Sequence, residues 1–487
     1  MLESCNNILY LMFRKKKKFY ITTSISYTNA PPHIGYAFEL IQADVLARYR
    51  RSLGEDVFFL TGTDEHGLKT LRMAKKLNKN PEEFVDEISK KFRELKQTLN
   101  LSNDDFIRTT DKIRHWPSVK KIWEKLEKNG DIYKKKYKGL YCIGCEAFIT
   151  QKDLVNSKCS VHLKAPELIE EENYFFKLSK YLPEIKKVIN KGEIKIIPES
   201  KKNEILSMIE QGIEDVSFSR EKEKYWGFST PNDENQIIYV WPDALSNYIS
   251  VLGYAENSGK FKKYWPADVH CIGKDIVKFH AIYWPAMLLS AKLKLPKLIF
   301  IHGFINVAGQ KMSKSLGNVI NPFELVKKYG QDAVRYYLLR EISPTEDGDF
   351  TYEKFEVKYN SDLAGGIGNL VARVLGIAGN IKINKLEPTK KMSKKIKETK
   401  NNCALALEKF RFNEALAVVW ELISYCDKYI NDEKLWETKN TETIKDLFYA
   451  LNEISDLLWP FLPQTAEKIK KAVKEKKSEI LFPKIVK

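Results

Sequence analysis

The chain of 487 residues carries 81 basic and 64 acidic side chains, which gives a net charge of +17. Its hydrophobic content of 43% and aromatic content of 12% exclude extended disorder and are typical of a globular protein. The length predicts about three domains, and the positive charge favours a polyanionic partner, nucleic acid before a membrane. No apolar run approaches the roughly 20 residues that span a bilayer, and the seven cysteines are mostly scattered. We therefore expect a cytoplasmic protein without a disulfide framework and without a membrane partner.

The first part of the chain alternates apolar strands with helices. Residues 19–26 are rich in aromatic and β-branched types and predict a buried strand, which leads into a helix over 33–51. A second strand is predicted at 57–61 and helical structure over 68–99. This alternation predicts a parallel sheet with helices on its faces, which binds ligands at the carboxyl ends of its strands.

The character of the sequence changes at about residue 111. Short polar segments and a cysteine cluster follow, which we interpret as an insertion into the sheet domain, and strands resume at 237–241, 268–272 and 297–302. After about residue 361 the pattern predicts an all-α bundle, with amphipathic helices over 364–381, 395–429, 442–459 and 463–475. The predicted parts are a basic N-terminal extension (1–18), two halves of a Rossmann-like sheet domain (19–110 and 226–300), the insertion (111–225), a linking region (301–360) and the terminal helical domain (361–487).

Two short motifs predict that the protein binds a nucleoside triphosphate. Lys311-Met312-Ser313-Lys314-Ser315 places two lysines in a loop, where they are suited to hold the phosphates of ATP. His33-Ile34-Gly35 opens a predicted helix, so a ring N–H donor and a bare backbone lie at a helix N-terminus. A single Lys-x-x-Lys is usually solvated surface. Both motifs together predict an enzyme that uses ATP with Mg²⁺.

The cysteine cluster has the spacing of a metal site. Cys142 and Cys145 form one C-x2-C pair, and Cys159 and His162 form a C-x2-H pair 13 residues later. Four such ligands give the closed tetrahedral arrangement of one structural Zn²⁺, with no open position for a catalytic water. The alternative is three buried cysteines with an incidental histidine.

Several further segments resemble one family. Residues 61–67, 141–146, 171–181, 240–248, 273–280, 311–318 and 332–341 resemble the class I methionyl-tRNA synthetases of the bacterial branch with a single zinc knuckle, and the likeness covers roughly residues 19–463. The resemblance implies an α/β fold: a Rossmann-like parallel-sheet catalytic domain with a zinc-binding connective insertion, followed by an all-α anticodon-binding bundle. It implies that L-methionine, ATP and tRNA(Met) are the partners, and that methionine is activated as methionyl-adenylate before its transfer to the tRNA.

The resemblance also implies roles for individual residues. The methionine site would contain Ile25, Tyr27, Asp64, Trp241, Ala244, Tyr248, Ile276 and His280, with Asp64 paired with the substrate ammonium and the aromatic rings around the thioether. The ATP site would contain His33, Gly35, Gly273, Lys274, Asp275, Lys311, Ser313 and Lys314, and the catalytic groups would be His33, Tyr36, Lys311 and Lys314. The tRNA anticodon would contact Asn369, Arg373 and Trp436. Taken singly, each of these residues is more often an ordinary core or packing residue.

Two positions depart from the family pattern. Tyr36 stands where a second histidine is common, so its hydroxyl either keeps the phosphate contact or its ring simply packs. Leu435 stands where proline is usual.

The interval between His33 and Lys311 leaves no room for a separate editing domain. The chain ends soon after the bundle, so we expect a monomer. The alternatives are a cysteinyl- or isoleucyl-type synthetase, a zinc-stabilised RNA-binding protein without catalysis, and a nucleotidyltransferase without tRNA.

Overall fold

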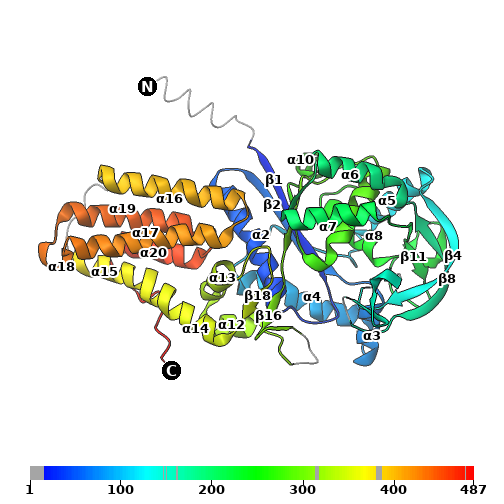
Figure 1. Ribbon diagram of the computed structural model, residues 1–487, viewed down its shortest axis with the longest axis horizontal. Helices are drawn as coiled ribbons and strands as arrows, with labels where there is room; N and C mark the ends of the chain where they lie inside the picture. The colour runs from blue at the N-terminus through cyan, green and yellow to red at the C-terminus, as the bar shows by residue number, and fades with distance from the viewer. Residues whose placement is uncertain are drawn as a thin grey trace, which may run out of the picture. The chain divides into compact units, whose positions relative to one another are not determined.

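The computed structural model describes residues 16–145, 147–149, 151–160, 163–312, 317–379, 387–477 and 479–486, and it divides the chain into two compact units. The sheet unit comprises Met1–Ala30, Ala47–Lys90 and Asn103–Ile301. The helical unit comprises Pro31–Leu46, Lys91–Ser102 and His302–Lys487. Figure 1 shows the labelled elements of both units. Among the described helices, none has the length and apolar character needed to cross a bilayer.

The sheet unit is built on a six-stranded sheet. Its strand order is β3 (Asp105–Arg108), β2 (Asp56–Asp64), β1 (Lys18–Tyr27), β14 (Val269–Gly273), β15 (Leu298–His302) and β9 (Lys195–Ile197). β1 pairs in parallel with both β2 and β14, so three strands carry their carboxyl ends to one edge of the sheet. The pairing of β1 with β2 shifts register between Thr22 and Ile25. Such bulges redirect side chains beside functional sites, and this one precedes the end of β1.

The insertion contributes mostly antiparallel structure to the sheet unit. A four-stranded sheet has the order β10 (Val216–Ser217), β8 (Glu167–Phe176), β4 (Ile132–Cys142) and β5 (Ala147–Ile149), beside the small hairpin of β6 (Leu154–Val155) and β7 (Lys158–Cys159). A three-stranded sheet follows, of β11 (Ser219–Glu221), β13 (Asp233–Ile238) and β12 (Ser229–Thr230). The helices among these strands are α5 (Trp116–Lys128), α6 (Leu182–Asn190) and α7 (Glu199–Glu210).

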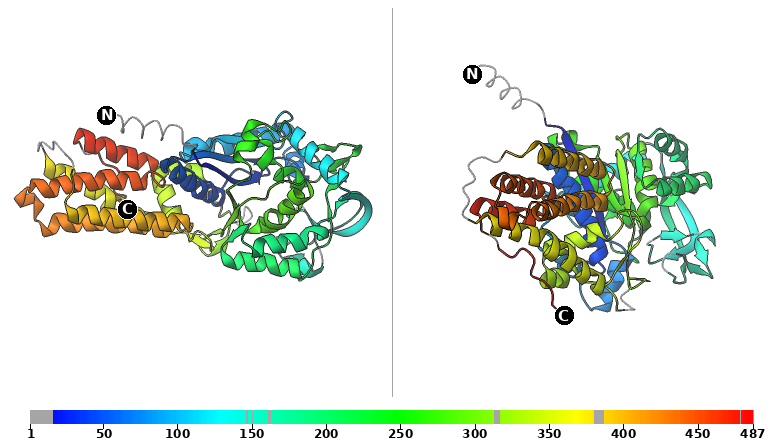
Figure 2. Two further views of the ribbon diagram at one scale, coloured as in Figure 1. Left: turned by 90° about the horizontal axis from the view of Figure 1, so that it is seen from above. Right: turned by 60° about the vertical axis from the view of Figure 1, so that its left-hand side comes forward.

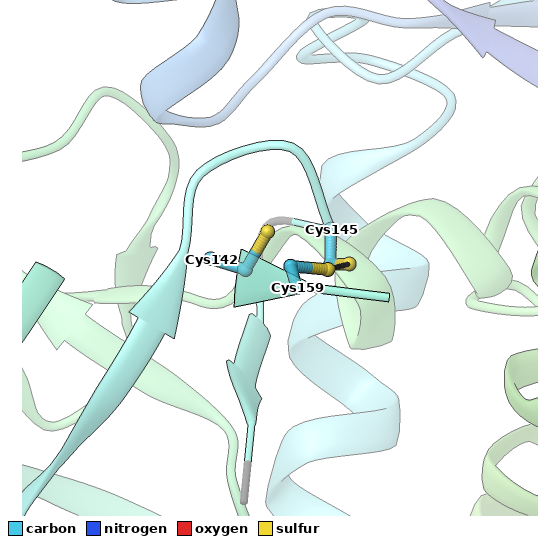
Figure 3. A group of neighbouring side chains, drawn as sticks. All are labelled: Cys142, Cys145 and Cys159. Carbon is cyan, nitrogen blue, oxygen red and sulfur yellow. Dashed lines mark hydrogen bonds between the residues drawn. The ribbon is translucent and has the colours of Figure 1, made fainter. Parts of the chain in front are cut away.

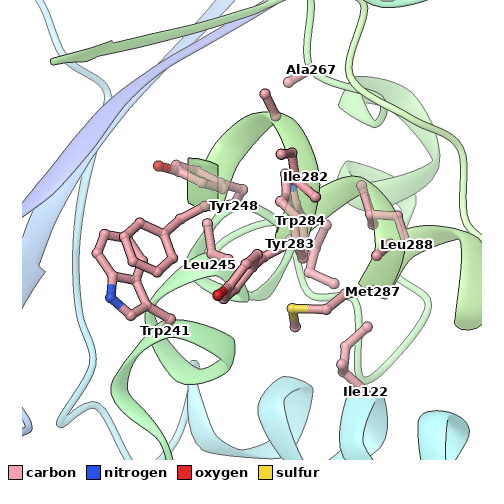
Figure 4. Packing of buried hydrophobic residues seen from close by; sticks show 14 of the residues in the cluster. Ile122, Trp241, Leu245, Tyr248, Ala267, Ile282, Tyr283, Trp284, Met287 and Leu288 are labelled. Carbon is pink, nitrogen blue, oxygen red and sulfur yellow. The ribbon is translucent and has the colours of Figure 1, made fainter. Parts of the chain in front are cut away.

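Short helices after β13 and β14 complete the sheet unit. They are α8 (Val240–Leu245), α9 (Asn247–Ser250), α10 (Gly259–Tyr264), a 3-10 turn (Lys274–Ile276), a π-helical turn (Phe279–Tyr283) and α11 (Trp284–Ser290). Their apolar side chains form one buried cluster, in which Trp241 and Tyr248 lie with Trp284 and Met287 (Figure 4). Trp241 stacks on Phe279 with ring centroids 3.5 Å apart. Rings packed in this way are fixed in position, so their free faces form a rigid wall.

The helical unit ends in a bundle. α15 (Asn369–Ala378), α16 (Lys390–Glu408), α17 (Phe412–Asp432), α19 (Thr441–Leu458) and α20 (Pro463–Glu475) are its long helices, and α18 (Leu435–Thr438) is a single turn (Figure 2). Ahead of them come β16 (Ile305–Val307), β17 (Gln310–Lys311), α12 (Pro322–Tyr329), α13 (Gln331–Arg340), β18 (Gly348–Phe350), α14 (Tyr352–Lys358) and a π-helical segment (Tyr359–Gly368). The long helices bury apolar faces against one another, as the amphipathic pattern predicts. The stretch predicted as one helix over 395–429 is two, α16 and α17, which are separated at 409–411.

Several predicted elements are confirmed and some are wrong in detail. The helix predicted at 33–51 is α2 (Ile34–Ser52), whereas the stretch 68–99 is two helices, α3 (Leu68–Lys76) and α4 (Pro81–Thr98). The break is physical, because Pro81 lacks the N–H that a continuous helix needs. The strand predicted at 237–241 ends at Ile238 and pairs antiparallel with β11, so it does not belong to the parallel sheet. The edge strand β9 lies within the predicted insertion and was not predicted.

Candidate functional site

The eight residues expected to bind methionine all lie in the sheet unit. Ile25 and Tyr27 end β1, and Tyr27 pairs in register with Asp64, the last residue of β2. α8 carries Trp241 and Ala244, and α9 carries Tyr248. Ile276 and His280 occupy the two helical turns after β14, the other neighbour of β1. The structure therefore brings the predicted residues to the carboxyl ends of three adjacent strands.

Ring contacts and hydrogen bonds connect these residues. The Trp241 ring lies edge-on to both Tyr27 and His280, with centroids 6.3 Å apart in each case. The Tyr248 hydroxyl lies 2.7 Å from Nε2 of His280, and Nδ1 of His280 lies 3.0 Å from the carbonyl oxygen of Ile276. Trp241, Tyr248 and His280 are buried, at 6%, 1% and 2% exposure. The aromatic residues thus form one connected, mostly dry cluster.

Two hydrogen bonds hold the His280 ring. A carbonyl oxygen only accepts, so Nδ1 carries a hydrogen and donates to Ile276, and Nε2 shares a hydrogen bond with the Tyr248 hydroxyl. Burial together with nearby His280 lowers the pKa of His270 well below its usual range. The His270 ring is therefore neutral at physiological pH.

The Gly273-Lys274-Asp275 segment lies at the end of β14 and opens the 3-10 turn that carries Ile276. Gly273 is buried, Lys274 is half-buried and Asp275 is exposed. In the chain the segment directly precedes Ile276, which belongs to the predicted methionine site. It lies at the carboxyl edge of the sheet, where a ligand is expected.

The first triphosphate motif lies at the start of α2, in the helical unit. The Gly35 N–H donates to Nδ1 of His33 over 3.1 Å, so the neutral imidazole carries its hydrogen on Nε2 and presents it as a donor. A Cβ at position 35 would lie 2.9 Å from Cε1 of His33, so glycine is required for this arrangement. His33 is exposed, as a phosphate ligand must be.

Tyr36 is placed differently from His33. Its side chain is buried, at 7% exposure, and its ring lies edge-on to Phe92 with centroids 5.1 Å apart. This geometry favours the packing alternative over a phosphate contact. The catalytic role of Tyr36 stays a prediction, and it is the one that the structure supports least.

The second triphosphate motif begins at the exposed end of a hairpin in the helical unit. Lys311 is the last residue of β17, which pairs antiparallel with β16 across a turn at Ala308 and Gly309. Both turn residues have positive φ, 51° and 74°, as a tight two-residue hairpin turn requires. Lys311 is exposed, and its Nζ lies 5.4 Å from the ring centre of Phe304. Ser313 and Lys314 lie outside the described residues.

Three of the four predicted metal ligands converge. The Sγ atoms of Cys142, Cys145 and Cys159 lie within 4.8 Å of one another, and those of Cys145 and Cys159 are 3.6 Å apart (Figure 3). Cys142 ends β4 and Cys159 ends β7, so these two thiols come from separate hairpins. Burial raises the pKa of the Cys142 and Cys145 thiols. The cluster is compatible with zinc, and His162 lies outside the described residues.

The residues expected to read the anticodon lie on the terminal bundle. Asn369 and Arg373 are on α15, and the Arg373 guanidinium donates to Asp427 over 2.8 Å and to Asn431 over 2.7 Å, both on α17. Trp436, on α18, is 50% exposed. Leu435, which replaces the usual proline, is only 1% exposed. The buried Leu435 side chain packs α18 against the bundle, so the turn that carries Trp436 is held in place.

A buried polar cluster beside the aromatic residues was not predicted. Asp243 contacts His66 and His115, which lie 177 and 128 positions away in the chain. Asp243 and His66 fall within segments that resemble the family, 240–248 and 61–67, but each is separately an ordinary loop or helix residue. Only the fold brings them together.

The parallel sheet with its cysteine-bearing insertion, the paired triphosphate motifs and the helical bundle define a class I aminoacyl-tRNA synthetase. A family model described as "tRNA synthetases class I (M)" matches residues 19–152 and 145–375, and one described as "Anticodon-binding domain of tRNA ligase" matches 389–485. The chain belongs to the methionyl-tRNA synthetase family and has methionine–tRNA ligase activity.

Individual relatives agree with this assignment. The methionine–tRNA ligase of Thermotoga maritima is 43% identical over 470 residues, which are 93% of this chain and 74% of the relative. That of Brucella suis is 40% identical over 471 residues, 93% of this chain and 91% of the relative. A solved structure of Mycobacterium tuberculosis methionyl-tRNA synthetase in complex with methionyl-adenylate is similar with a TM-score of 0.88 at 35% identity, covering 93% of each chain.

The predicted family, fold class and enzymatic activity are therefore confirmed, and the alternatives outside this family are excluded. The predicted domain boundaries, the monomeric state and the cytoplasmic location stay predictions.

Proposed function

We propose that the aromatic cluster of the sheet unit binds L-methionine. The observation that carries this proposal is the hydrogen-bonded chain from Tyr248 through His280 to Ile276, which holds both rings beside Trp241. An aromatic wall suits a thioether, because sulfur makes favourable contacts with aromatic rings. Ile25, Tyr27 and Ala244 complete the wall. Asp64, at the end of the neighbouring strand, accepts hydrogen bonds from the substrate ammonium.

Methionine activation needs no general base. The substrate carboxylate is ionised at neutral pH, and one of its oxygens attacks the α-phosphorus of Mg-bound ATP. The bond from that phosphorus to the bridging oxygen breaks, and pyrophosphate leaves with the electron pair. Catalysis is then a matter of positioning and of stabilising charge on the phosphate oxygens. We assign that stabilisation to the His33 Nε2–H group and to the ammonium groups of Lys311 and Lys314.

The remaining proposed ATP contacts come from glycine backbone and from polar side chains. Gly35 allows the nucleotide close to the start of α2, and Ser313 supplies a hydroxyl to the phosphates. Gly273, Lys274 and Asp275 would contact the ribose side of the nucleotide. Support comes from the M. tuberculosis relative, whose structure contains methionyl-adenylate, the product of the same first step. In the second step, a ribose hydroxyl of the terminal adenosine of tRNA attacks the methionyl carbonyl carbon and loses its proton. The bond from that carbon to the phosphate oxygen breaks, and AMP leaves with the electron pair.

We assign one structural zinc ion to Cys142, Cys145, Cys159 and His162. The three described ligands are thiols at the spacing that a single ion can bridge, and thiolate with imidazole is a usual donor set for zinc. The ion would join the turn after β4 to the hairpin of β6 and β7 and so hold the insertion together.

The experiment that tests the methionine site is the substitution Asp64→Asn. The amide keeps the shape of the side chain but removes the negative charge that faces the ammonium. We expect the KM for methionine in ATP–pyrophosphate exchange to rise by at least about tenfold, with the KM for ATP unchanged. A wild-type methionine KM would contradict the assignment.

The exposed ring of Trp436 is proposed to stack on an anticodon base of tRNA(Met), with Asn369 and Arg373 on the same bundle as hydrogen-bond donors. A stacked base contributes about 1–3 kcal/mol, so Trp436→Ala should raise the KM for tRNA in aminoacylation by about 5- to 150-fold. Pyrophosphate exchange without tRNA should be unchanged. Leu405→Ala is the matched control, because Leu405 is an exposed apolar side chain of the same bundle, at 59% exposure. Equal losses of exchange and aminoacylation in Trp436→Ala would contradict the stacking role.

A further inference from the structure

A buried carboxylate lies between two imidazole rings in the sheet unit. Oδ2 of Asp243 is 2.7 Å from Nδ1 of His66, and Oδ1 of Asp243 is 3.0 Å from Nε2 of His115. The side chains of Asp243, His66 and His115 are 1%, 3% and 0% exposed. Nδ1 of His115 lies 2.9 Å from Oγ of Ser250. We call these four residues the Asp243 cluster.

The neighbours of Asp243 favour its ionised form. Burial alone would raise the pKa of the Asp243 carboxyl, but His66 and His115 more than offset it, so the pKa lies below its usual range. Asp243 is therefore a carboxylate that accepts an N–H from each ring. A buried carboxylate held by two such donors is costly to disturb, because loss of either partner leaves charge uncompensated.

Three members of the cluster lie within two positions in the chain of a residue of the proposed methionine site. His66 follows Asp64 by two positions. Asp243 stands on α8 between Trp241 and Ala244, and Ser250 lies on α9 with Tyr248. The cluster thus joins the end of β2, which carries the proposed ammonium ligand, to the two short helices that carry the aromatic wall.

A second contact restrains the same loop after β2. The Glu65 carboxylate, 0% exposed, accepts from Nε and Nη2 of Arg108 over 2.7 and 2.9 Å, and Thr63 donates to it over 2.7 Å. Glu65 is thus held to β3, and His66 is held to α8. Of these two restraints, only the one through His66 extends to the aromatic wall.

We propose that Asp243 is a positioning residue for methionine activation, which sets the separation between the Asp64 carboxylate and the Trp241 and Tyr248 rings through its bonds to His66 and His115. The inference rests on the proposed methionine site. Methionine spans that separation, from its ammonium group to its thioether, so a change in the separation weakens methionine binding and leaves ATP binding unaffected. Displacement of a binding group by about 1 Å can cost about 100-fold in rate.

The test uses Asp243→Asn in the full chain. The amide fills the same space, but it accepts on one side only, so one imidazole must change tautomer or move. We expect the KM for methionine in pyrophosphate exchange to rise at least about tenfold while the KM for ATP stays at the wild-type value. A wild-type methionine KM, or an equal rise of both KM values, would overturn the proposal.

Conservative substitutions at His66 give a second, independent readout. Asn places an amide N–H near the position of Nδ1, so His66→Asn should retain a methionine KM close to wild type, whereas His66→Leu should raise it as Asp243→Asn does. Equal KM values for His66→Asn and His66→Leu would overturn the proposal even if Asp243→Asn fails to fold.

Two control variants distinguish failure of the positioning role of Asp243 from failure of the proposed methionine site. Asp131 is an equally buried carboxylate of the same unit, bound by Lys180 and Ser290 over 2.7 Å each. Asp131→Asn should lower stability without changing the methionine KM. Asp64→Asn tests the methionine site itself. A raised methionine KM in Asp64→Asn with a wild-type KM in Asp243→Asn overturns only the positioning role, whereas a wild-type KM in Asp64→Asn overturns the proposed site.

Discussion

Replacing Lys311 by alanine is expected to slow methionine-dependent pyrophosphate exchange by about 100- to 1000-fold, the usual effect of removing one group that stabilises transition-state charge. Lys311 is exposed on β17, and its ammonium contacts only the ring of Phe304 among the interactions described for it. The fold should therefore tolerate the change. Lys314, outside the described residues, is expected to behave in the same way because of its place in the motif.

The matched control is Lys354→Ala. Lys354 is also an exposed lysine of the helical unit, at 63% side-chain exposure, with Asp349 as its ion-pair partner over 3.5 Å. Its removal should leave the exchange rate unchanged, because it has no proposed contact with ATP. Wild-type exchange in Lys311→Ala, with unchanged thermal unfolding, would contradict the assignment of the lysine motif to phosphate stabilisation.

The second large effect concerns the stability of the helical unit. Arg335, on α13, pairs with Asp44 of α2 over 2.8 Å, and both side chains are fully buried. The same guanidinium donates to the carbonyl oxygens of Leu99, Pro460 and Phe461 over 3.1, 3.0 and 2.6 Å. One side chain thus joins the helix that begins with the His33 motif to the chain after α4 and to the corner before α20.

Arg335→Met is therefore expected to lower the free energy of unfolding by about 3–5 kcal/mol, since it leaves the Asp44 carboxylate buried without its cation. Denaturant unfolding measures this change. Arg373→Met is the control, because the Arg373–Asp427 pair of the same unit is 29% and 25% exposed, and partly solvated pairs of this kind contribute about 0–1 kcal/mol. Equal destabilisation by the two substitutions would contradict the dominant role of the buried pair.

Much of the fold follows from local sequence patterns. The strands predicted at 19–26, 57–61, 268–272 and 297–302 are β1, β2, β14 and β15, because buried parallel strands read as continuous apolar runs. The three residues of β9 are too few to show any periodicity. β13 has an apolar end like a buried parallel strand, and nothing local distinguishes its antiparallel partners.

Some residues of the site could also be predicted from the sequence, and others could not. The side chains proposed to contact ligand belong to motifs, so the resemblance to a family could indicate Asp64, Trp241 and His280 from sequence. The Asp243 cluster could not be indicated, because its hydrogen bonds join residues 128 to 177 positions apart and depend on the complete fold. Tyr36 shows the reverse case: its place in a motif predicts phosphate contact, but the fold buries its ring against Phe92.

In the proposed site, recognition of methionine depends most on the Asp64 carboxylate as the ligand of the substrate ammonium. The most direct measurement compares kcat/KM for methionine with that for its α-hydroxy acid analogue, in which a hydroxyl replaces the ammonium, in the wild type and in Asp64→Asn. We expect the preference for methionine to fall by at least about tenfold in the variant, while kcat/KM for the analogue changes little. An unchanged preference would contradict it.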